Sequence, residues 1–215
     1  MAKRVLVVLS GCGFLDGSEV HEAVLSLLAL DRAGARVTCA APDKPFAVVD
    51  HRTGKPSGET RNVLVEAARI ARGHIVPLAS VNAVDFDGIF LPGGFGAAKN
   101  LSTVAVDGPN ATVEPDLVAL LKAFRAAGKP IGAVCIAPAV VVAALREGDV
   151  TIGNDAGTAA AIAAMGGANV SCPVTVAHVD EARKLVTTPA YMYETHIADA
   201  AVGIDAAVAR FLELA

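Results

Sequence analysis

The chain has 215 residues, of which 53% are hydrophobic and only 4% aromatic, with no tryptophan. This length and apolar content predict a single domain, residues 1–215, with an ample core. The net charge of −4 and the lack of a long basic stretch exclude nucleic acid as an expected partner. No apolar run approaches the length of a transmembrane helix, so a membrane partner is not expected either.

The first part of the chain predicts a βαβ unit. Residues 4–9 form an apolar strand, a glycine-rich loop follows at 10–17, and Ser18 is placed to cap a helix. The apolar residues of that helix, spaced i, i+4, i+7 and i+8, are Val20, Val24, Leu27 and Leu28. This spacing predicts that they face the core. Gly34 ends the helix and residues 35–40 form the next strand, parallel to the first.

The rest of the chain alternates strand and helix signals, which is typical of one α/β domain with a mostly parallel sheet. Strands are expected at 47–51, 88–91, 131–134, 150–153, 174–178 and 184–188, and residues 81–86 lead into the strand at 88–91. Helices are expected at 60–71, 114–127, 156–165 and 195–214, with another directly after residue 135. Residues 73–78 are ambiguous and 101–112 are irregular.

Cys135 follows the apolar strand at 131–134 and precedes a helix with Pro138 in its first turn. Ala133 and Ala137 are small, as a sharp strand–nucleophile–helix turn requires. The helix N-terminus lowers the pKa of a thiol placed there, which would make Cys135 a nucleophile without a metal. The alternative is a buried, inert cysteine in an apolar strand–helix pair.

Three loops are expected to meet at the carboxyl ends of the strands: 10–17, 92–96 and the turn at Cys135. There the N–H groups of Gly94 and Ile136 could form an oxyanion hole, with a tight turn that binds no ligand as the alternative. Glu19, at the start of the first helix, could approach Cys135 with a raised pKa. The alternative is an ordinary first-turn glutamate, which is also the interpretation preferred for Glu22.

The remaining cysteines and the histidines leave several possibilities open. Cys12 either lines the pocket or forms a redox pair with Cys135, whereas Cys39 and Cys172 are interpreted as core or strand residues. His178 and His196 are the preferred candidates for a base near Cys135, with surface positions as the alternative.

The motifs argue against a metal site and a cofactor site, and they favour one cellular location. The four cysteines form no C-x-x-C motif and the five histidines no metal-ligand spacing, so no metal is expected. The glycine-rich loop lacks the third glycine of a dinucleotide fingerprint, so no cofactor is expected. The run at 5–9 is too short for a signal peptide, and the unpaired cysteines fit reduced thiols, so a cytoplasmic location is expected.

Three stretches resemble the signatures of the PfpI-like superfamily, which has the class I glutaminase-like fold: GSEVHE at 17–22, LPGGFGAAKNLS at 91–102 and AVCIAP at 133–138. Over nearly its whole length the chain resembles the ElbB group, described as glyoxalases or as isoprenoid biosynthesis proteins with an amidotransferase-like domain. The stretches that resemble this group are SGCG at 10–13, APDK at 41–44, ETRNVL at 59–64 and TTPAYM at 187–192.

The resemblance implies a flavodoxin-like three-layer sandwich with a nucleophile elbow, usually in a homodimer. It implies Cys135 as the nucleophile, Glu19 as its protonated hydrogen-bond partner, and the Gly94 and Ile136 N–H groups as the oxyanion site. It also implies a cofactor-free glyoxalase that converts a small aldehyde, glyoxal, to glycolate through a Cys135 hemithioacetal.

The chain departs from other members of this superfamily. It has Ile136 where protease-like members have histidine, and it lacks the flanking glycines and downstream His-x-Glu of the glutaminases. Proteolysis and glutamine hydrolysis are therefore disfavoured, and the lack of an obvious histidine base predicts slow turnover. The alternatives are a redox or carbonyl-stress sensor linked to isoprenoid biosynthesis, and a hydrolase or amidase of the same fold.

Overall fold

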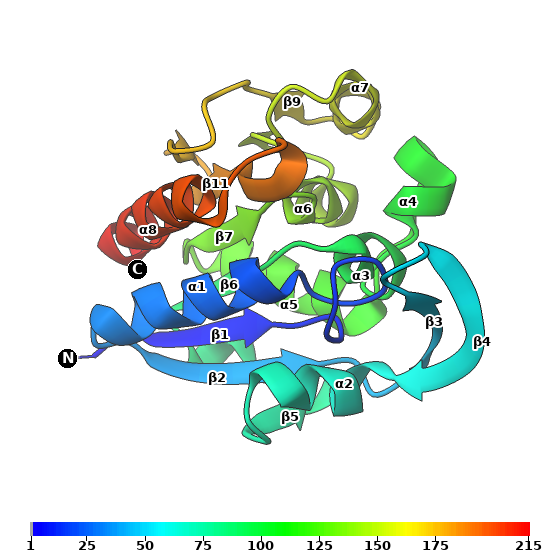
Figure 1. Ribbon diagram of the computed structural model, residues 1–215. Coiled ribbons are helices and arrows are strands. Elements are labelled where there is room, and N and C mark those ends of the chain that lie inside the picture. Colours follow the sequence, from blue (N-terminus) through cyan, green and yellow to red (C-terminus); the bar gives the residue numbers. More distant parts are fainter. Residues whose placement is uncertain (1) are drawn as a thin grey trace.

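The computed structural model describes residues 2–215, and its centre is a seven-stranded sheet with helices on both faces (Figure 1). The strand order is β10-β11-β7-β6-β1-β2-β5, and β10 is antiparallel to its neighbour while the other pairs are parallel. These strands are β1 (Arg4–Val8), β2 (Arg36–Ala41), β5 (Ile75–Pro77), β6 (Gly88–Leu91), β7 (Ile131–Val134), β10 (His178–Asp180) and β11 (Leu185–Thr188). The predicted flavodoxin-like sandwich with a mostly parallel sheet is confirmed.

The two faces of the sheet have separate cores because side chains alternate along each strand. Val5 and Val7 of β1 join one core, and Leu6 and Val8 join the other. The first core is covered by α1 (Val20–Arg32), α2 (Val63–Ile70) and α8 (Ile197–Leu214). The second is covered by α3 (Phe95–Lys99), α4 (Val104–Asp107), α5 (Pro115–Ala126), α6 (Ala137–Leu145) and α7 (Ala156–Ala164). Across residues 2–215, every helix is too short or too polar to span a bilayer.

Two small sheets lie outside the central one. The hairpin β3 (Pro45–Asp50) and β4 (Lys55–Asn62) is antiparallel, and the short pair β8 (Asp149–Val150) and β9 (Ala168–Asn169) is parallel. The helix predicted at 60–71 starts later than expected because residues 60–62 pair with β3. Asn62 then caps α2, its side-chain oxygen accepting the Val65 N–H at 3.1 Å. The irregular stretch at 101–112 contains α4, and the ambiguous stretch at 73–78 contains β5.

Helix α1 faces the core with a side other than the predicted one. Val20, Val24 and Leu28 are 37%, 48% and 39% exposed. The side chains that α1 buries are Glu22, Ala23, Ser26, Ala29 and Leu30. Most of them are small, and the buried residues of α8, which packs beside α1, include Ala200 and Gly203, so the two helices can approach closely. The predicted cap is also wrong. Glu19 caps α1, whereas the Ser18 hydroxyl accepts the Ser10 N–H at 2.8 Å.

Candidate active site

Cys135 occupies a tight turn between β7 and α6. Its φ of 62° lies in the left-handed region, which residues other than glycine rarely adopt and which costs about 1–3 kcal/mol. The turn is held in place because the Cys135 N–H donates to the Thr188 carbonyl of β11 at 2.9 Å. A strand, a strained nucleophile and a helix in this order form the elbow that the sequence predicts.

The carboxyl group that contacts Cys135 belongs to Glu22, in the first turn of α1. Glu22 is fully buried, and its side chain hydrogen-bonds the Cys135 thiol. Its Oε2 accepts the Gly93 N–H at 3.0 Å and its Oε1 accepts the Tyr191 N–H at 3.3 Å. The expectation that Glu19 is the hydrogen-bond partner of Cys135 is therefore wrong. The Glu19 carboxylate instead accepts the backbone N–H of Glu22, at 2.7 Å.

The surroundings of Glu22 favour its neutral form. Burial, and after it the negative charge of Glu19, raise the pKa of Glu22 to about 8, although the hydrogen bonds from Cys135 and the two backbone groups oppose this shift. At neutral pH the carboxyl is therefore mostly protonated. A neutral carboxyl can donate a proton to the sulfur, and its carboxylate form can accept one.

The thiol of Cys135 is held in its neutral form as well. Burial, and then the negative charge of Glu22, raise the pKa of Cys135 well above its usual value. Hydrogen bonds from the Gly94 and Ile136 N–H groups act in the opposite direction without reversing the shift. The helix N-terminus thus does not by itself produce the thiolate that the sequence predicts, and the thiol and carboxyl titrate as a coupled pair.

Two glycines allow the loop after β6 to approach Cys135. Gly94 has a φ of 93°, and its N–H, together with that of Ile136, points to the sulfur. A Cβ on Gly93 would lie 2.5 Å from the Cys135 Cβ and 2.7 Å from Glu22 Oε2. Only a glycine therefore leaves room for the thiol–carboxyl contact. The two predicted oxyanion donors are brought to the same sulfur atom.

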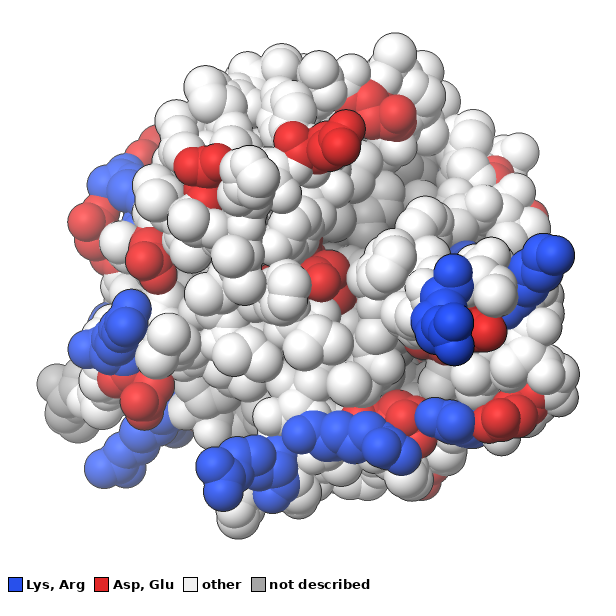
Figure 2. All heavy atoms as spheres, viewed as in Figure 1, with Lys and Arg blue, Asp and Glu red and all other residues white. Residues whose placement is uncertain are grey.

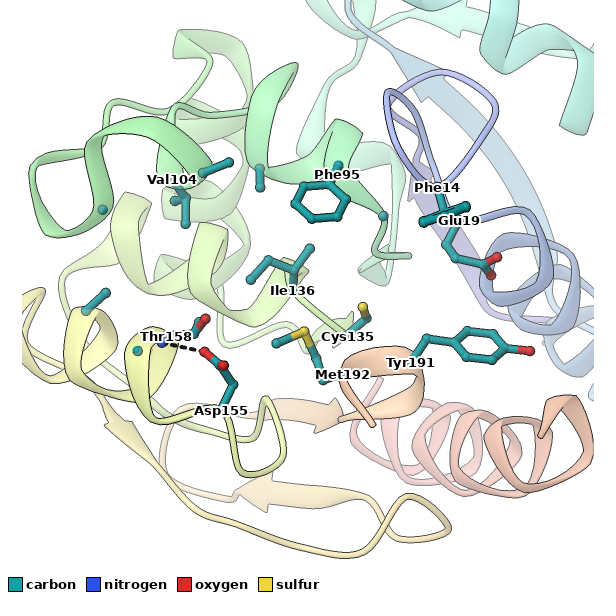
Figure 3. A pocket seen from close by; sticks show the side chains of 16 residues that line it. Phe14, Glu19, Phe95, Val104, Cys135, Ile136, Asp155, Thr158, Tyr191 and Met192 are labelled. Carbon is teal, nitrogen blue, oxygen red and sulfur yellow. Dashed lines mark hydrogen bonds between the residues drawn. The ribbon is translucent and has the colours of Figure 1, made fainter. Parts of the chain in front are cut away.

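Cys135 opens onto a pocket of about 520 Å³ (Figure 3). Phe14, Glu19 and Tyr191 lie on one side of it, and Val104 and Thr158 lie on the other. Glu22 is fully buried and does not line this pocket. Cys135 thus contacts a buried carboxyl group and also opens onto the pocket.

Other predicted site residues lie elsewhere. Cys12 lines a separate hollow with Asp16, His51 and Glu66, so its assignment to the Cys135 pocket is wrong. No histidine of residues 2–215 lines the pocket, which leaves both His178 and His196 outside it. His21 contacts a residue of the pocket, since its Nδ1 lies 2.9 Å from the hydroxyl of Tyr191.

Sequence reasoning missed Glu22 and Tyr191 as members of the site. Tyr191 follows β11 in a short 3-10 helix, η4 (Ala190–Met192), and no motif in the sequence distinguishes it. Glu22 had a usable signal. It shares a helix face with Ser26 and Leu30, at i, i+4 and i+8, and a stripe of this kind is an alternative to the more hydrophobic one at Val20, Val24 and Leu28.

A buried cysteine on an elbow, a carboxyl partner and two converging backbone N–H groups define a class of α/β proteins with a cysteine nucleophile on the class I glutaminase-like fold. The chain belongs to the DJ-1/PfpI family, whose model matches residues 3–187. A human protein, "Glutamine amidotransferase-like class 1 domain-containing protein 3, mitochondrial", is 50% identical over 99% of this chain and 84% of its own length. The "ES1 protein, mitochondrial" of Danio rerio is 34% identical over 89% of this chain and 78% of its own length.

Solved structures agree with this assignment. The crystal structure of an Ehrlichia chaffeensis "isoprenoid biosynthesis protein with amidotransferase-like domain" is 40% identical and has a TM-score of 0.91, covering 98% of this chain and 99% of that one. Drosophila melanogaster DJ-1beta, 20% identical with a TM-score of 0.56, shares the fold.

Proposed function

We propose that the protein is a cofactor-independent glyoxalase, a lyase of the hydro-lyase type with low activity, that converts glyoxal and other small 2-oxoaldehydes plus water to 2-hydroxy acids such as glycolate. The observation that supports this is the contact of the Cys135 thiol with Glu22, which supplies a nucleophile and a proton carrier at one point. A pKa of about 8 gives the carboxyl both protonation states near physiological pH, as a group that both accepts and donates a proton requires.

The first half of the proposed reaction is addition. Glu22, as its carboxylate, accepts the S–H proton while the sulfur forms a bond to one aldehyde carbon. The electron pair of that C=O bond moves to oxygen, where the Gly94 and Ile136 N–H groups stabilise the negative charge. The proton then passes from Glu22 to this oxygen and gives a hemithioacetal.

The second half is an internal oxidation and reduction. Glu22 removes the C–H proton of the hemithioacetal carbon, and the electron pair forms an enediolate with the adjacent carbonyl. Glu22 returns the proton to the adjacent carbon, and the hydroxyl proton passes to the neighbouring oxygen. The first carbon becomes a thioester and the second an alcohol, so no external oxidant is needed. Water then adds to the thioester, the C–S bond breaks, and Cys135 regains its proton.

Glu19 has a positioning role in this scheme. Its carboxylate fixes the first turn of α1 through the Glu22 N–H, and its negative charge contributes to the raised pKa of Glu22. In Figure 3 the Glu19 side chain lies beside Tyr191, on the side of the pocket away from Thr158.

The test is glycolate formation from glyoxal by purified protein, compared between wild type, Cys135→Ser and Cys12→Ser. We expect Cys135→Ser to lose at least about a thousandfold in kcat/KM, because a serine hydroxyl beside a carboxyl is a far weaker nucleophile than a thiol. Cys12 lies in the other hollow, so Cys12→Ser should stay close to wild type. Equal turnover by wild type and Cys135→Ser would refute the proposal.

A second candidate is a redox or carbonyl-stress sensor. The observation that favours it is the set of donors around the sulfur, the Gly94 and Ile136 N–H groups and the neutral Glu22 carboxyl, since these would hydrogen-bond the oxygens of a sulfinate. Two equivalents of peroxide would oxidise the thiol to a sulfinic acid and release two waters. Stoichiometric addition of two oxygen atoms at Cys135, found by intact-mass and peptide analysis together with negligible glyoxal turnover, would favour this role. The description of the Ehrlichia protein suggests isoprenoid biosynthesis as its setting.

The homodimer implied by the resemblance and the cytoplasmic location expected from the sequence are also proposals. The exposed stripe of Val20, Val24 and Leu28 on α1 is a surface that a second copy would cover. Light scattering should detect a dimer that Val24→Glu dissociates, whereas Val106→Glu, on an 80% exposed residue of α4, should leave it intact. The names of the human and Danio rerio relatives place those proteins in mitochondria, so the location needs direct imaging.

A further inference from the structure

The pocket beside Cys135 differs in size and charge from a site built for glyoxal. We propose that it selects uncharged or cationic carbonyl compounds with an apolar arm longer than that of glyoxal, and that it discriminates against anions. This inference rests on the proposed function for the reaction, but it concerns the shape and charge of the pocket, which can be tested without turnover.

The first argument is size. A pocket of about 520 Å³ lies within the range of about 300–1,000 Å³ that sites for drug-sized ligands occupy. Glyoxal would fill a small part of it and leave the rest to water. A substrate that displaces this water with apolar surface gains binding free energy of about 25 cal/mol per Å² buried.

The second argument is where the space lies. On the side of Cys135 away from Glu19, the wall includes Ile136, Met192 and Val104, and Ala161 of α7 also lines the pocket (Figure 3). Asp155 and Thr158 lie on this side as well, but the other four side chains offer a ligand no hydrogen-bonding group stronger than the thioether of Met192. A carbonyl carbon at the sulfur therefore places the remainder of a longer substrate against apolar side chains.

The third argument is charge. The ionised groups that line the pocket are the carboxylates of Glu19 and Asp155, and no Lys, Arg or His of residues 2–215 lines it. Asp155 caps α7, its side chain accepting the Thr158 N–H at 2.7 Å, and this bonding lowers the pKa of Asp155 and keeps it charged. Figure 2 shows a hollow on this face bordered by uncharged and acidic atoms, with the basic side chains along the lower edge and toward the left and right margins.

One cation lies near the rim without entering the pocket. Lys99 Nζ donates to the Leu15 carbonyl at 3.2 Å and lies 4.9 Å from the centre of the Phe95 ring. Phe95 lines the pocket, whereas Leu15 and Lys99 itself do not. A substrate carboxylate at Cys135 would therefore be desolvated without a counter-charge, which is unfavourable.

The experiment measures how fast Cys135 is alkylated by iodoacetamide, iodoacetate and 2-iodo-N-phenylacetamide. These reagents share a leaving group and differ in charge and in the apolar arm. Rates at Cys135, followed by peptide mass spectrometry, are divided by the rates with a small thiol in solution. We expect the N-phenyl reagent to gain about tenfold over iodoacetamide, and iodoacetate to lose about tenfold. An equal or faster rate with iodoacetate, or no gain from the phenyl group, would overturn the inference.

Matched variants test the location of the selective wall. Ala161→Leu fills the far end of the pocket and should remove most of the gain from the phenyl group. Ala160→Leu adds the same volume at the next residue of α7, which is exposed and outside the pocket, and should keep the gain. Asp155→Asn retains the cap and should raise the relative rate of iodoacetate about twofold, less at high salt, because Asp155 is exposed. Equal effects of Ala161→Leu and Ala160→Leu would refute the assignment.

Turnover separates this inference from the proposed function. With glyoxal, phenylglyoxal and 4-carboxyphenylglyoxal as substrates, all of which carry the adjacent carbonyl that the reaction needs, we expect the highest kcat/KM for phenylglyoxal and a lower value for its carboxylate analogue. Turnover of glyoxal without preference for phenylglyoxal would keep the proposed function and reject the selectivity. If none of the substrates turns over, the proposed function fails, and the alkylation series still decides the selectivity.

Discussion

The protein contains two cysteine–glutamate pairs near the carboxyl ends of its strands, and their surroundings are opposite. Cys135 contacts Glu22, which is fully buried and receives hydrogen bonds from two backbone N–H groups. Cys12 lines a hollow with Glu66, which is also buried but contacts two guanidinium groups, Arg69 at 2.8 Å and Arg61 at 3.6 Å. The Cys12–Glu66 pair therefore has positive counter-charges beside its carboxyl, whereas the Cys135–Glu22 pair has none.

The two pairs thus contain the same residue types and differ in the counter-charge beside the carboxyl. Two arginines bind the Glu66 side chain, and the contact with Arg61 joins β4 to α2. Without such partners, Glu22 holds a proton at neutral pH and can pass it to and from Cys135. Burial, then the charge of Glu66, raise the pKa of the Cys12 thiol, and Arg69 opposes that rise, but no proton carrier is provided.

The largest expected effect comes from exchanging each carboxyl for an amide. Glu22→Gln should lower kcat/KM for glyoxal by about a hundredfold to ten-thousandfold, because general acid–base catalysis of this kind contributes that much. Glu66→Gln should leave turnover unchanged and reduce the free energy of unfolding by about 1 kcal/mol, since its arginine partners are largely exposed.

The folded state of Glu22→Gln needs its own check, because an amide has a single oxygen for the two N–H groups that Glu22 accepts. Thermal unfolding and near-UV circular dichroism would show that the fold is retained, and Glu22→Asp gives a shorter acid for comparison. If both glutamine variants lowered turnover equally, the two pairs would not differ in function.

The sequence predicts those features of the two pairs that depend on neighbouring residues, and it misses those that depend on contacts between residues far apart in the chain. The turn at Cys135 is local, since an apolar strand, two small residues and Pro138 define it, and the positions of Gly94 and Ile136 follow from the parallel sheet. The choice of Glu22 is not local. It depends on which face of α1 packs against α8, and the more hydrophobic face is the exposed one.

The misplacement of Cys12 has the same kind of cause. Its loop does begin at the carboxyl end of β1, and Phe14 of that loop lines the Cys135 pocket, but Cys12 itself lies in the other hollow, beside the distant hairpin. The Asp16 carboxylate accepts the Val49 N–H at 2.8 Å, and the Leu15 N–H donates to His51 Nε2 at 3.2 Å. Contacts between residues this far apart leave no pattern in a single sequence.

The next largest difference between Glu22 and Glu66 is expected in the pH dependence of stability. The pKa of Glu22 is raised from 4.5 to about 8, so above pH 4.5 the folded state binds a proton that the unfolded state has lost. The contribution of Glu22 to stability is therefore complete below pH 4.5 and is lost progressively as the pH rises from there through 8, by about 5 kcal/mol in total. Urea unfolding at several pH values should show this loss in wild type and in Glu66→Gln but not in Glu22→Gln. Parallel pH profiles of wild type and Glu22→Gln would contradict it.

Adding one methyl group at each of two glycines gives a smaller contrast. Gly93→Ala places a Cβ 2.5 Å from the Cys135 Cβ, and overpacking of this kind costs about 1–3 kcal/mol. Gly58→Ala, on the hairpin over the Cys12 hollow, meets nothing within 4 Å and costs about 1 kcal/mol for its φ of 82°. Glyoxal turnover should fall with Gly93→Ala and persist with Gly58→Ala. A stable and fully active Gly93→Ala protein would show that the thiol–carboxyl contact is not needed.

The smallest effect concerns the reactivity of Cys12. Burial and, after it, the negative charge of Glu66 raise the pKa of the Cys12 thiol, so Glu66→Gln should lower that pKa and increase the thiolate fraction at pH 8. We expect maleimide labelling of Cys12 to become about two to three times faster in this variant. Labelling of Cys172, which lies in a third hollow with Tyr193, provides the internal reference. An unchanged ratio of Cys12 to Cys172 labelling would mean that the arginines already cancel the charge of Glu66 at Cys12. The contrast with Glu22 would then be sharper, because the Cys12 pair would have no electrostatic coupling at all.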